Sequence, residues 1–112
     1  MKLWIDDVRP APEGYVWCKS VNAAKKRIKD CEADMRFHWK RYGYVSTRMS
    51  VELIDIDHDA GDYACDGGDY IKLLDWLEET DRNYPIRIHS GNVVGIINMR
   101  RIIQHNGWKE VF

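Results

Sequence analysis

The stretch that decides the fold is Val51-Glu52-Leu53-Ile54-Asp55-Ile56-Asp57-His58-Asp59, near the middle of the chain. Its beginning is nearly all apolar, and the run then changes to titratable side chains. Such a run is typical of a central strand covered on both faces of a sheet. We therefore predict a strand over residues 51–57 with a polar site directly after it. By strand alternation Asp55 shares a face with Asp57, and we expect a buried, hydrogen-bonded carboxylate there rather than a reactant.

Two other short apolar runs end in the same way. Leu3-Trp4-Ile5 is followed by Asp6-Asp7, and Ile86-Arg87-Ile88 is followed by His89-Ser90. In an open, mostly parallel sheet, ligands bind in the crevice beyond the carboxyl ends of the strands. The sequence therefore predicts one polar rim, made of Asp6, Asp7, Asp57, His58, Asp59, His89 and Ser90.

The other elements follow from periodicity and capping signals. Tyr15–Cys18 is predicted to be a strand, and Ser20 to cap a helix that either continues through Trp39 or is followed by a second helix. Residues 40–50 are predicted to form a loop. Further along, Asp69 is expected to cap a helix, a helix is expected around residues 95–106 with a left-handed end at Asn106-Gly107, and residues 109–112 could form a closing strand. Strands and helices alternate in the latter half, which predicts a parallel α/β sheet.

The link between the first two predicted strands is unusually short, at about nine residues. A parallel crossover needs a dozen or more residues, usually in a helix. We therefore predict that these two strands are either antiparallel neighbours or not adjacent, and that one crossover helix is missing.

Length and composition limit the class of protein. The 112 residues allow one domain, and no apolar stretch approaches the ~20 residues that span a bilayer. The N-terminus does not have the pattern of a signal segment, and the three cysteines show no C-x-x-C spacing. These features predict reduced thiols and a cytoplasmic location.

The net charge of −1 hides a strong asymmetry along the chain. Residues 19–48 carry a balance of +6, residues 49–84 a balance of −9, and residues 85–112 a balance of +3. Strong non-specific binding to DNA is not expected, because that affinity comes from summed phosphate contacts. The acidic middle coincides with the predicted rim, so a divalent cation, Mg²⁺ or Mn²⁺, is the natural partner there.

The rim residues suggest specific roles. Asp6, Asp7 and Asp57 could hold a metal ion through hard oxygen ligands, or Asp6 or Asp7 could simply cap the turn before Pro10. His58, flanked by Asp57 and Asp59, is a plausible general acid, and His89 could form a two-imidazole pair with it. Ser90 and Asn92 stand just before a predicted helix, where phosphate binds well.

Together these segments resemble the cyclic-phosphate-processing receiver-like family, a group of degenerate receiver domains. The resemblance rests on Asp6-Asp7-x-Arg9-Pro10, Asp57-His58-Asp59-x-Gly61-Asp62, Gly67-Gly68-Asp69-Tyr70 and His89-Ser90-x-Asn92-x-x-Gly95 with Met99. It spans nearly the whole chain, with residues 32–50 as a variable insertion. It implies a single receiver-like (flavodoxin-like) domain over residues 1–112, a three-layer α/β sandwich with a mostly parallel sheet.

The resemblance also implies a pocket and an activity. The pocket would contain Asp6, Asp7, Arg9, Asp57, His58, Asp59, His89, Ser90 and Asn92. Two departures are visible: Val93 replaces a Pro common in the family, and no Lys ends a final strand as in signalling receivers. The implied role is processing of a cyclic phosphate on a nucleotide or an RNA end.

Three functions follow as hypotheses. The first is a cyclic-phosphate phosphodiesterase, with His58, His89, Asp57 and Asp59 as catalytic residues and Arg9, Ser90 and Asn92 holding the phosphate. The second is a module that binds or senses a phosphorylated nucleotide without cleaving it. The third is a degenerate phospho-accepting regulator that uses Asp57.

Overall fold

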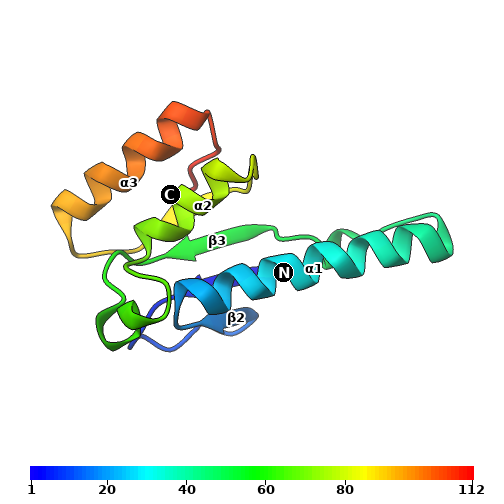
Figure 1. Ribbon diagram of the computed structural model, residues 1–112, viewed down its shortest axis with the longest axis horizontal. Helices are drawn as coiled ribbons and strands as arrows, with labels where there is room; N and C mark the ends of the chain where they lie inside the picture. Colours follow the sequence, from blue (N-terminus) through cyan, green and yellow to red (C-terminus); the bar gives the residue numbers. More distant parts are fainter.

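The structure, a computed structural model, describes residues 1–112. Its four strands form one parallel sheet in the order β2-β1-β3-β4, namely β2 (Tyr15–Cys18), β1 (Lys2–Ile5), β3 (Leu53–Ile56) and β4 (Ile86–Ile88). The helices are α1 (Val21–Tyr42), α2 (Ile71–Glu79) and α3 (Val93–Asn106), and two 3₁₀ turns occur at η1 (Thr47–Met49) and η2 (Gly61–Cys65). Figure 1 shows their arrangement. The α/β class with a parallel sheet is confirmed and is consistent with a receiver-like, flavodoxin-like fold.

The prediction for the first two strands is wrong. β1 and β2 are parallel neighbours, paired from Lys2 with Tyr15 to Ile5 with Cys18. As expected, no helix connects them. The connecting loop is instead held by two indoles, because Trp4 Nε1 donates to the Arg9 carbonyl at 2.9 Å and Trp17 Nε1 donates to the Asp6 carbonyl at 2.7 Å. Side chains thus satisfy loop carbonyls that a helix would have paired internally.

The hydrophobic core lies on one face of the sheet. Leu3, Ile5, Ile54, Ile56 and Ile86 are fully buried there, and the buried apolar residues of all three helices join them in one cluster. The opposite face carries Trp4, Trp17, Asp55 and Arg87, which are aligned by the strand register. No helix covers this face, and the loop of residues 6–14 contacts it through the indoles of Trp4 and Trp17.

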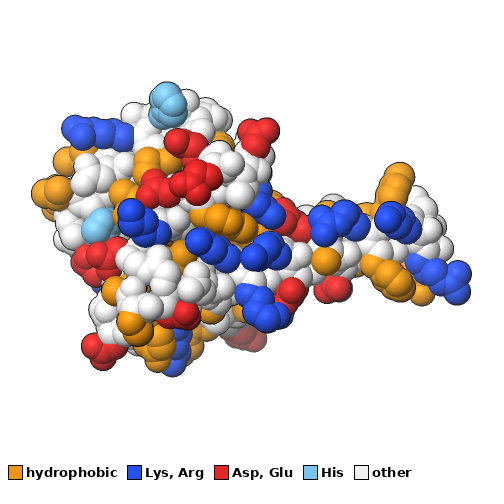
Figure 2. Space-filling view, in the orientation of Figure 1, with side chains coloured by type: hydrophobic (Ala, Val, Ile, Leu, Met, Phe, Trp, Pro, Cys, Tyr) orange, Lys and Arg blue, Asp and Glu red, His pale blue; other side chains and the backbone are white.

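Helix α1 is longer than the sheet that it covers. It begins at the Ser20 cap, where the hydroxyl accepts from Ala23 N at 3.0 Å, and it ends at Gly43, whose φ of 76° is left-handed. Its last turns project away from the body, as Figures 1 and 2 show. Residues 32–42, within the stretch expected to be a variable insertion, are therefore a continuation of α1. Glu32 anchors this continuation, since it accepts hydrogen bonds from Arg82 and Tyr84.

Two smaller predictions also need correction. The Asp69 carboxylate does not cap α2, because it accepts a hydrogen bond from Ala60 N at 3.1 Å instead. Residues 109–112 form no strand, and only an isolated parallel bridge joins Ile86 to Glu110. The end of α3 is as predicted, with Gly107 left-handed at φ 67° and Trp108 packed back into the core. None of the helices combines the length and the apolar character needed to cross a bilayer.

Candidate active site

The carboxyl ends of β1 and β3 bring three carboxylates together. Asp6, Asp7 and Asp57 each offer an oxygen, and these oxygens all lie within 4.8 Å of one another. Asp6 is buried, whereas Asp7 is half-buried. The strands place them there because β1 and β3 are parallel and paired in register, Ile5 with Ile56, so the residues that follow emerge side by side.

Asp6 is the most constrained of the three. Its Oδ1 accepts hydrogen bonds from Val8 N at 3.0 Å and Arg9 N at 2.9 Å, so it does cap the turn before Pro10. Its Oδ2 lies 2.9 Å from His89 Nε2. Burial by itself raises the pKa of Asp6, but the hydrogen bonds from Arg9, Val8 and His89 outweigh it and lower the pKa below 3.8. Asp6 is therefore an ionised carboxylate at neutral pH.

Asp7 and Asp57 are freer to meet a ligand. Asp57 Oδ1 accepts from His58 N at 2.7 Å. The Asp7 carboxylate takes part in none of the hydrogen bonds or ion pairs of the rim, and it lies against Gly61, where an added Cβ would overlap Asp7 Oδ2. Three carboxylates with oxygens this close fit the preference of Mg²⁺ and Mn²⁺ for hard oxygen ligands. The donor set could therefore hold a divalent cation.

His89 is fixed between two buried carboxylates. Its Nδ1 lies 2.6 Å from Asp55 Oδ1 and its Nε2 lies 2.9 Å from Asp6 Oδ2. Asp55 is fully buried, as the alternation of the strand predicted, and it is also approached by Arg87 Nη1 at 3.3 Å. Both ring nitrogens of His89 can donate at once only when the ring is an imidazolium. Contacts at both nitrogens therefore hold the His89 ring in place.

His58 has a different environment. Its Nδ1 lies 2.9 Å from Asp59 Oδ1 and 3.3 Å from Asn92 Nδ2. The hydrogen bond from His58 lowers the pKa of Asp59, and the hydrogen bond between Asn92 and Asp59 lowers it further. No protein group pairs with Nε2, and the side chain is 16% exposed. His58 can therefore present one free ring nitrogen to a ligand.

The predicted phosphate-binding residues are brought together only in part. Asn92 caps α3 by accepting from Gly95 N at 2.9 Å, and Ser90 Oγ accepts from Asn92 N at 3.1 Å, so both stand at the amino end of that helix. The Arg9 backbone is tied to Asp6 and Trp4, but its side chain is exposed and pairs with no rim residue.

Three further residues shape the rim and were not predicted as parts of it. The Trp4 ring stacks on His89, with centroids 3.7 Å apart. Gly95 lies against the His58 ring, where a Cβ would overlap the imidazole carbons. Tyr70 is fully buried; burial and then the charges of the three rim carboxylates raise its pKa. Trp4 looks like an ordinary core residue in the sequence, whereas Tyr70 and Gly95 stand in the segments on which the family resemblance rests.

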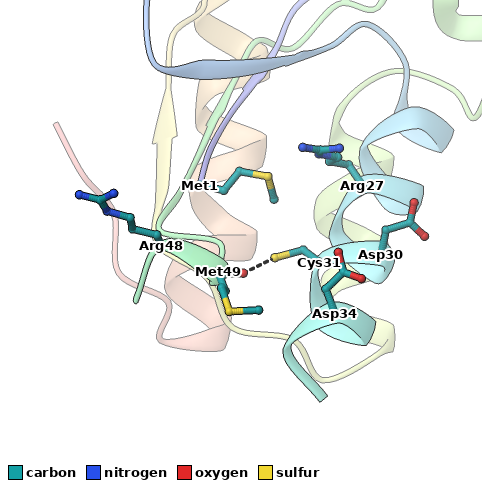
Figure 3. Close-up of a pocket in the computed structure, with 7 residues that line it drawn as sticks. All are labelled: Met1, Arg27, Asp30, Cys31, Asp34, Arg48 and Met49. Carbon is teal, nitrogen blue, oxygen red and sulfur yellow. Dashed lines mark hydrogen bonds between the residues drawn. The ribbon is translucent and has the colours of Figure 1, made fainter. Parts of the chain in front are cut away.

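A cavity lies elsewhere in the molecule. A cavity of about 200 Å³ opens between α1 and residues 48–49, near Met1 at the opposite, amino edge of the sheet (Figure 3). Arg27, Asp30, Cys31 and Asp34 of α1 line it with Met1, Arg48 and Met49. None of the predicted site residues faces this cavity. The candidate active site is instead an open rim of polar side chains.

Comparison with known proteins bears on the identity of this rim. No curated protein and no solved structure is significantly similar to the chain. The family described as the cyclic-phosphate processing receiver domain matches residues 1–105, which include every residue of the rim. The chain belongs to the family of cyclic-phosphate processing receiver domains.

Proposed function

We propose that the protein is a phosphodiesterase that opens a cyclic phosphate on a nucleotide or an RNA end. The observation that carries the proposal is the meeting of Asp6, Asp7 and Asp57 with His89 and the His58–Asn92 pair on one rim. Cyclic-phosphate hydrolysis needs a group that removes a proton from water, a group that protonates the leaving oxygen, and positive charge near the phosphoryl oxygens. The rim contains candidates for all three.

His58 is proposed as the principal acid–base group. Its Nδ1 is held by the Asp59 carboxylate, to which Asn92 Nδ2 also donates, and this leaves Nε2 to exchange a proton with the substrate. In the proposed reaction a water oxygen attacks phosphorus, one P–O bond of the cyclic ester breaks, and the leaving sugar oxygen takes up a proton. The product is a phosphomonoester, so water is the only co-reactant.

His89 is proposed to act beside His58, but in an unequal role. Its two nitrogens are engaged by Asp55 and Asp6, so it can exchange a proton with the substrate only when its contact with Asp6 opens. Asp57, through the His58 backbone, helps to position the first histidine. Ser90, Asn92 and the exposed side chain of Arg9 are proposed to hold the phosphate.

A divalent ion is proposed as an aid rather than a requirement of the fold. Asp6, Asp7 and Asp57 would hold it, and when bound it would supply positive charge to the phosphoryl oxygens. Of the three carboxylates, Asp6 is the least available to the ion, because both of its oxygens already accept hydrogen bonds.

The test is hydrolysis of a panel of 2′,3′-cyclic and 3′,5′-cyclic nucleotides with and without Mg²⁺ or Mn²⁺. Wild-type protein is expected to turn over at least one member, and His58→Ala and His89→Ala are expected to lose turnover while remaining folded by circular dichroism. A matched control is His105→Ala, an exposed histidine in the last turn of α3. Full activity in both rim variants would contradict the mechanism.

A second candidate function is a module that binds a phosphorylated nucleotide without cleaving it. The engagement of both His89 nitrogens by carboxylates favours this alternative, because a ring held at both ends has no free nitrogen for catalysis. A cyclic nucleotide that binds stoichiometrically and is recovered intact after long incubation would support it over the hydrolase.

A further inference from the structure

An aromatic and cationic cluster lies beside the three carboxylates. It consists of Trp17 and Lys19, at and just beyond the end of β2, and Tyr63 of the η2 turn. The Lys19 ammonium lies 4.5 Å from the centre of the Trp17 ring and 5.9 Å from that of Tyr63. One cation therefore faces two aromatic rings that come from segments more than forty residues apart in the sequence.

The cluster is connected directly to the candidate active site. The Trp17 indole donates to the carbonyl of Asp6 at 2.7 Å, and Gly61, at the start of the η2 turn, lies against the Asp7 carboxylate. A molecule whose phosphate lies at the carboxylates would therefore extend over these rings.

The core does not account for this cluster. Trp17 is 37% exposed and Tyr63 is 38% exposed, and neither belongs to the buried hydrophobic cluster or packs against it. Lys19 forms none of the ion pairs of the protein, so its flexible side chain can move off the rings at little cost. Two half-exposed rings with a mobile cation are typical of surfaces that stack nucleobases, since every base has a π-face.

We propose that Trp17, Lys19 and Tyr63 form the nucleobase subsite of the candidate active site. The base stacks on the two rings, and Lys19 donates to a base carbonyl or a phosphate oxygen. This inference rests on the proposed function, because it takes the carboxylate rim as the place of the phosphate. It makes nucleotides the preferred substrate class over small cyclic phosphates that carry no base.

The first part of the test compares 2′,3′-cyclic AMP with a ribose 2′,3′-cyclic phosphate that lacks the base. Wild-type protein is expected to prefer the nucleotide, and Trp17→Ala and Tyr63→Ala are each expected to raise the KM for the nucleotide by about 10-fold or more, so that the preference over the baseless compound is lost. Trp17→Phe keeps a stacking ring but loses the bond to Asp6, so it should retain most of the preference. Trp39→Ala is the control, because Trp39 is 61% exposed on the projecting part of α1.

The second part does not depend on turnover. The indole N–H resonance of Trp17, identified by its loss in Trp17→Phe, is followed by NMR during titration with 3′-AMP and with ribose 3-phosphate. A shift with 3′-AMP alone supports the subsite even if no cyclic nucleotide is hydrolysed, in which case only the proposed hydrolase activity fails. Equal binding of both compounds, or binding of 3′-AMP unchanged by Trp17→Ala and Tyr63→Ala, would overturn the subsite.

Discussion

The imidazole of His89 lies flat on the indole of Trp4, with ring centroids 3.7 Å apart and ring planes 4° apart. At the two ends of the ring, Asp55 and Asp6 close off the nitrogens at 2.6 Å and 2.9 Å. A ring held on its face and at both ends has one orientation. The His89 ring is thus fixed in place by its neighbours before any ligand arrives.

Asp55 is expected to act as a positioning residue for His89. Asp55→Asn keeps the shape of the side chain but removes its charge, so it should lower turnover by at least about 10-fold and move the pH profile and the ¹⁵N resonances of the His89 ring. Arg87→Ala is the matched control, because Arg87 also contacts Asp55 but is 46% exposed. If Asp55→Asn left the profile and the resonances unchanged, the role would be structural only.

A glycine is expected to be required at position 95, because the His58 ring packs against it. Alanine normally stabilises a helix interior over glycine by about 1 kcal/mol, but a Cβ at Gly95 would overlap the imidazole. Gly95→Ala should therefore lower the free energy of unfolding and reduce activity through a displaced His58. Asn98→Ala, at an exposed position of the same helix, should be neutral or slightly stabilising. Urea unfolding measures both, and a stabilised, fully active Gly95→Ala would contradict this packing argument.

Asp7 is expected to matter for metal binding more than for folding. Its carboxylate has no hydrogen-bond partner on the rim, so Asp7→Asn should leave the melting temperature nearly unchanged while weakening Mn²⁺ binding. Titration calorimetry or Mn²⁺ electron paramagnetic resonance gives the affinity without any need for turnover. Asp62→Asn, an exposed carboxylate of the η2 turn, is the control. Equal Mn²⁺ affinity in wild type and Asp7→Asn would remove Asp7 from the site.

Asp6 is expected to make stability depend on acid pH. Its pKa is below 3.8 in the folded state, so the unfolded chain binds the proton more readily. The stability that Asp6 contributes is therefore fully present above its unfolded pKa, near pH 4, and is lost as the pH falls through its folded pKa. Other acids also titrate here, so the measurement is the difference between wild type and Asp6→Asn in urea unfolding between pH 2.5 and 7. The variant should show the shallower fall.

Much of the rim could be predicted from the sequence, because each of its polar clusters directly follows an apolar run. An apolar run followed at once by Asp57-His58-Asp59 indicates a strand end with polar groups, and parallel pairing then places it beside Asp6. The buried carboxylate of Asp55 followed from alternation alone. The caps at Ser20 and Gly107 were readable for the same reason, since each depends on one residue and its neighbours.

The features that the sequence did not indicate depend on contacts between distant segments. The parallel pairing of β1 with β2 across a short loop depends on the Trp4 and Trp17 indoles reaching loop carbonyls, which no local pattern shows. Asp69 was predicted to cap α2 from its position in the sequence, but its carboxylate accepts a hydrogen bond from Ala60 N instead.

The chain by itself determined which strands end in carboxylates and histidines, because strand period and turn chemistry are properties of neighbouring residues. Only the tertiary structure decided that His89 is closed between Asp6 and Asp55 while His58 keeps one nitrogen free, because those partners lie 83, 34 and 34 residues away along the chain. Two histidines that look equivalent in sequence therefore have different surroundings. The distinction comes from which side chains the packed sheet brings to each ring.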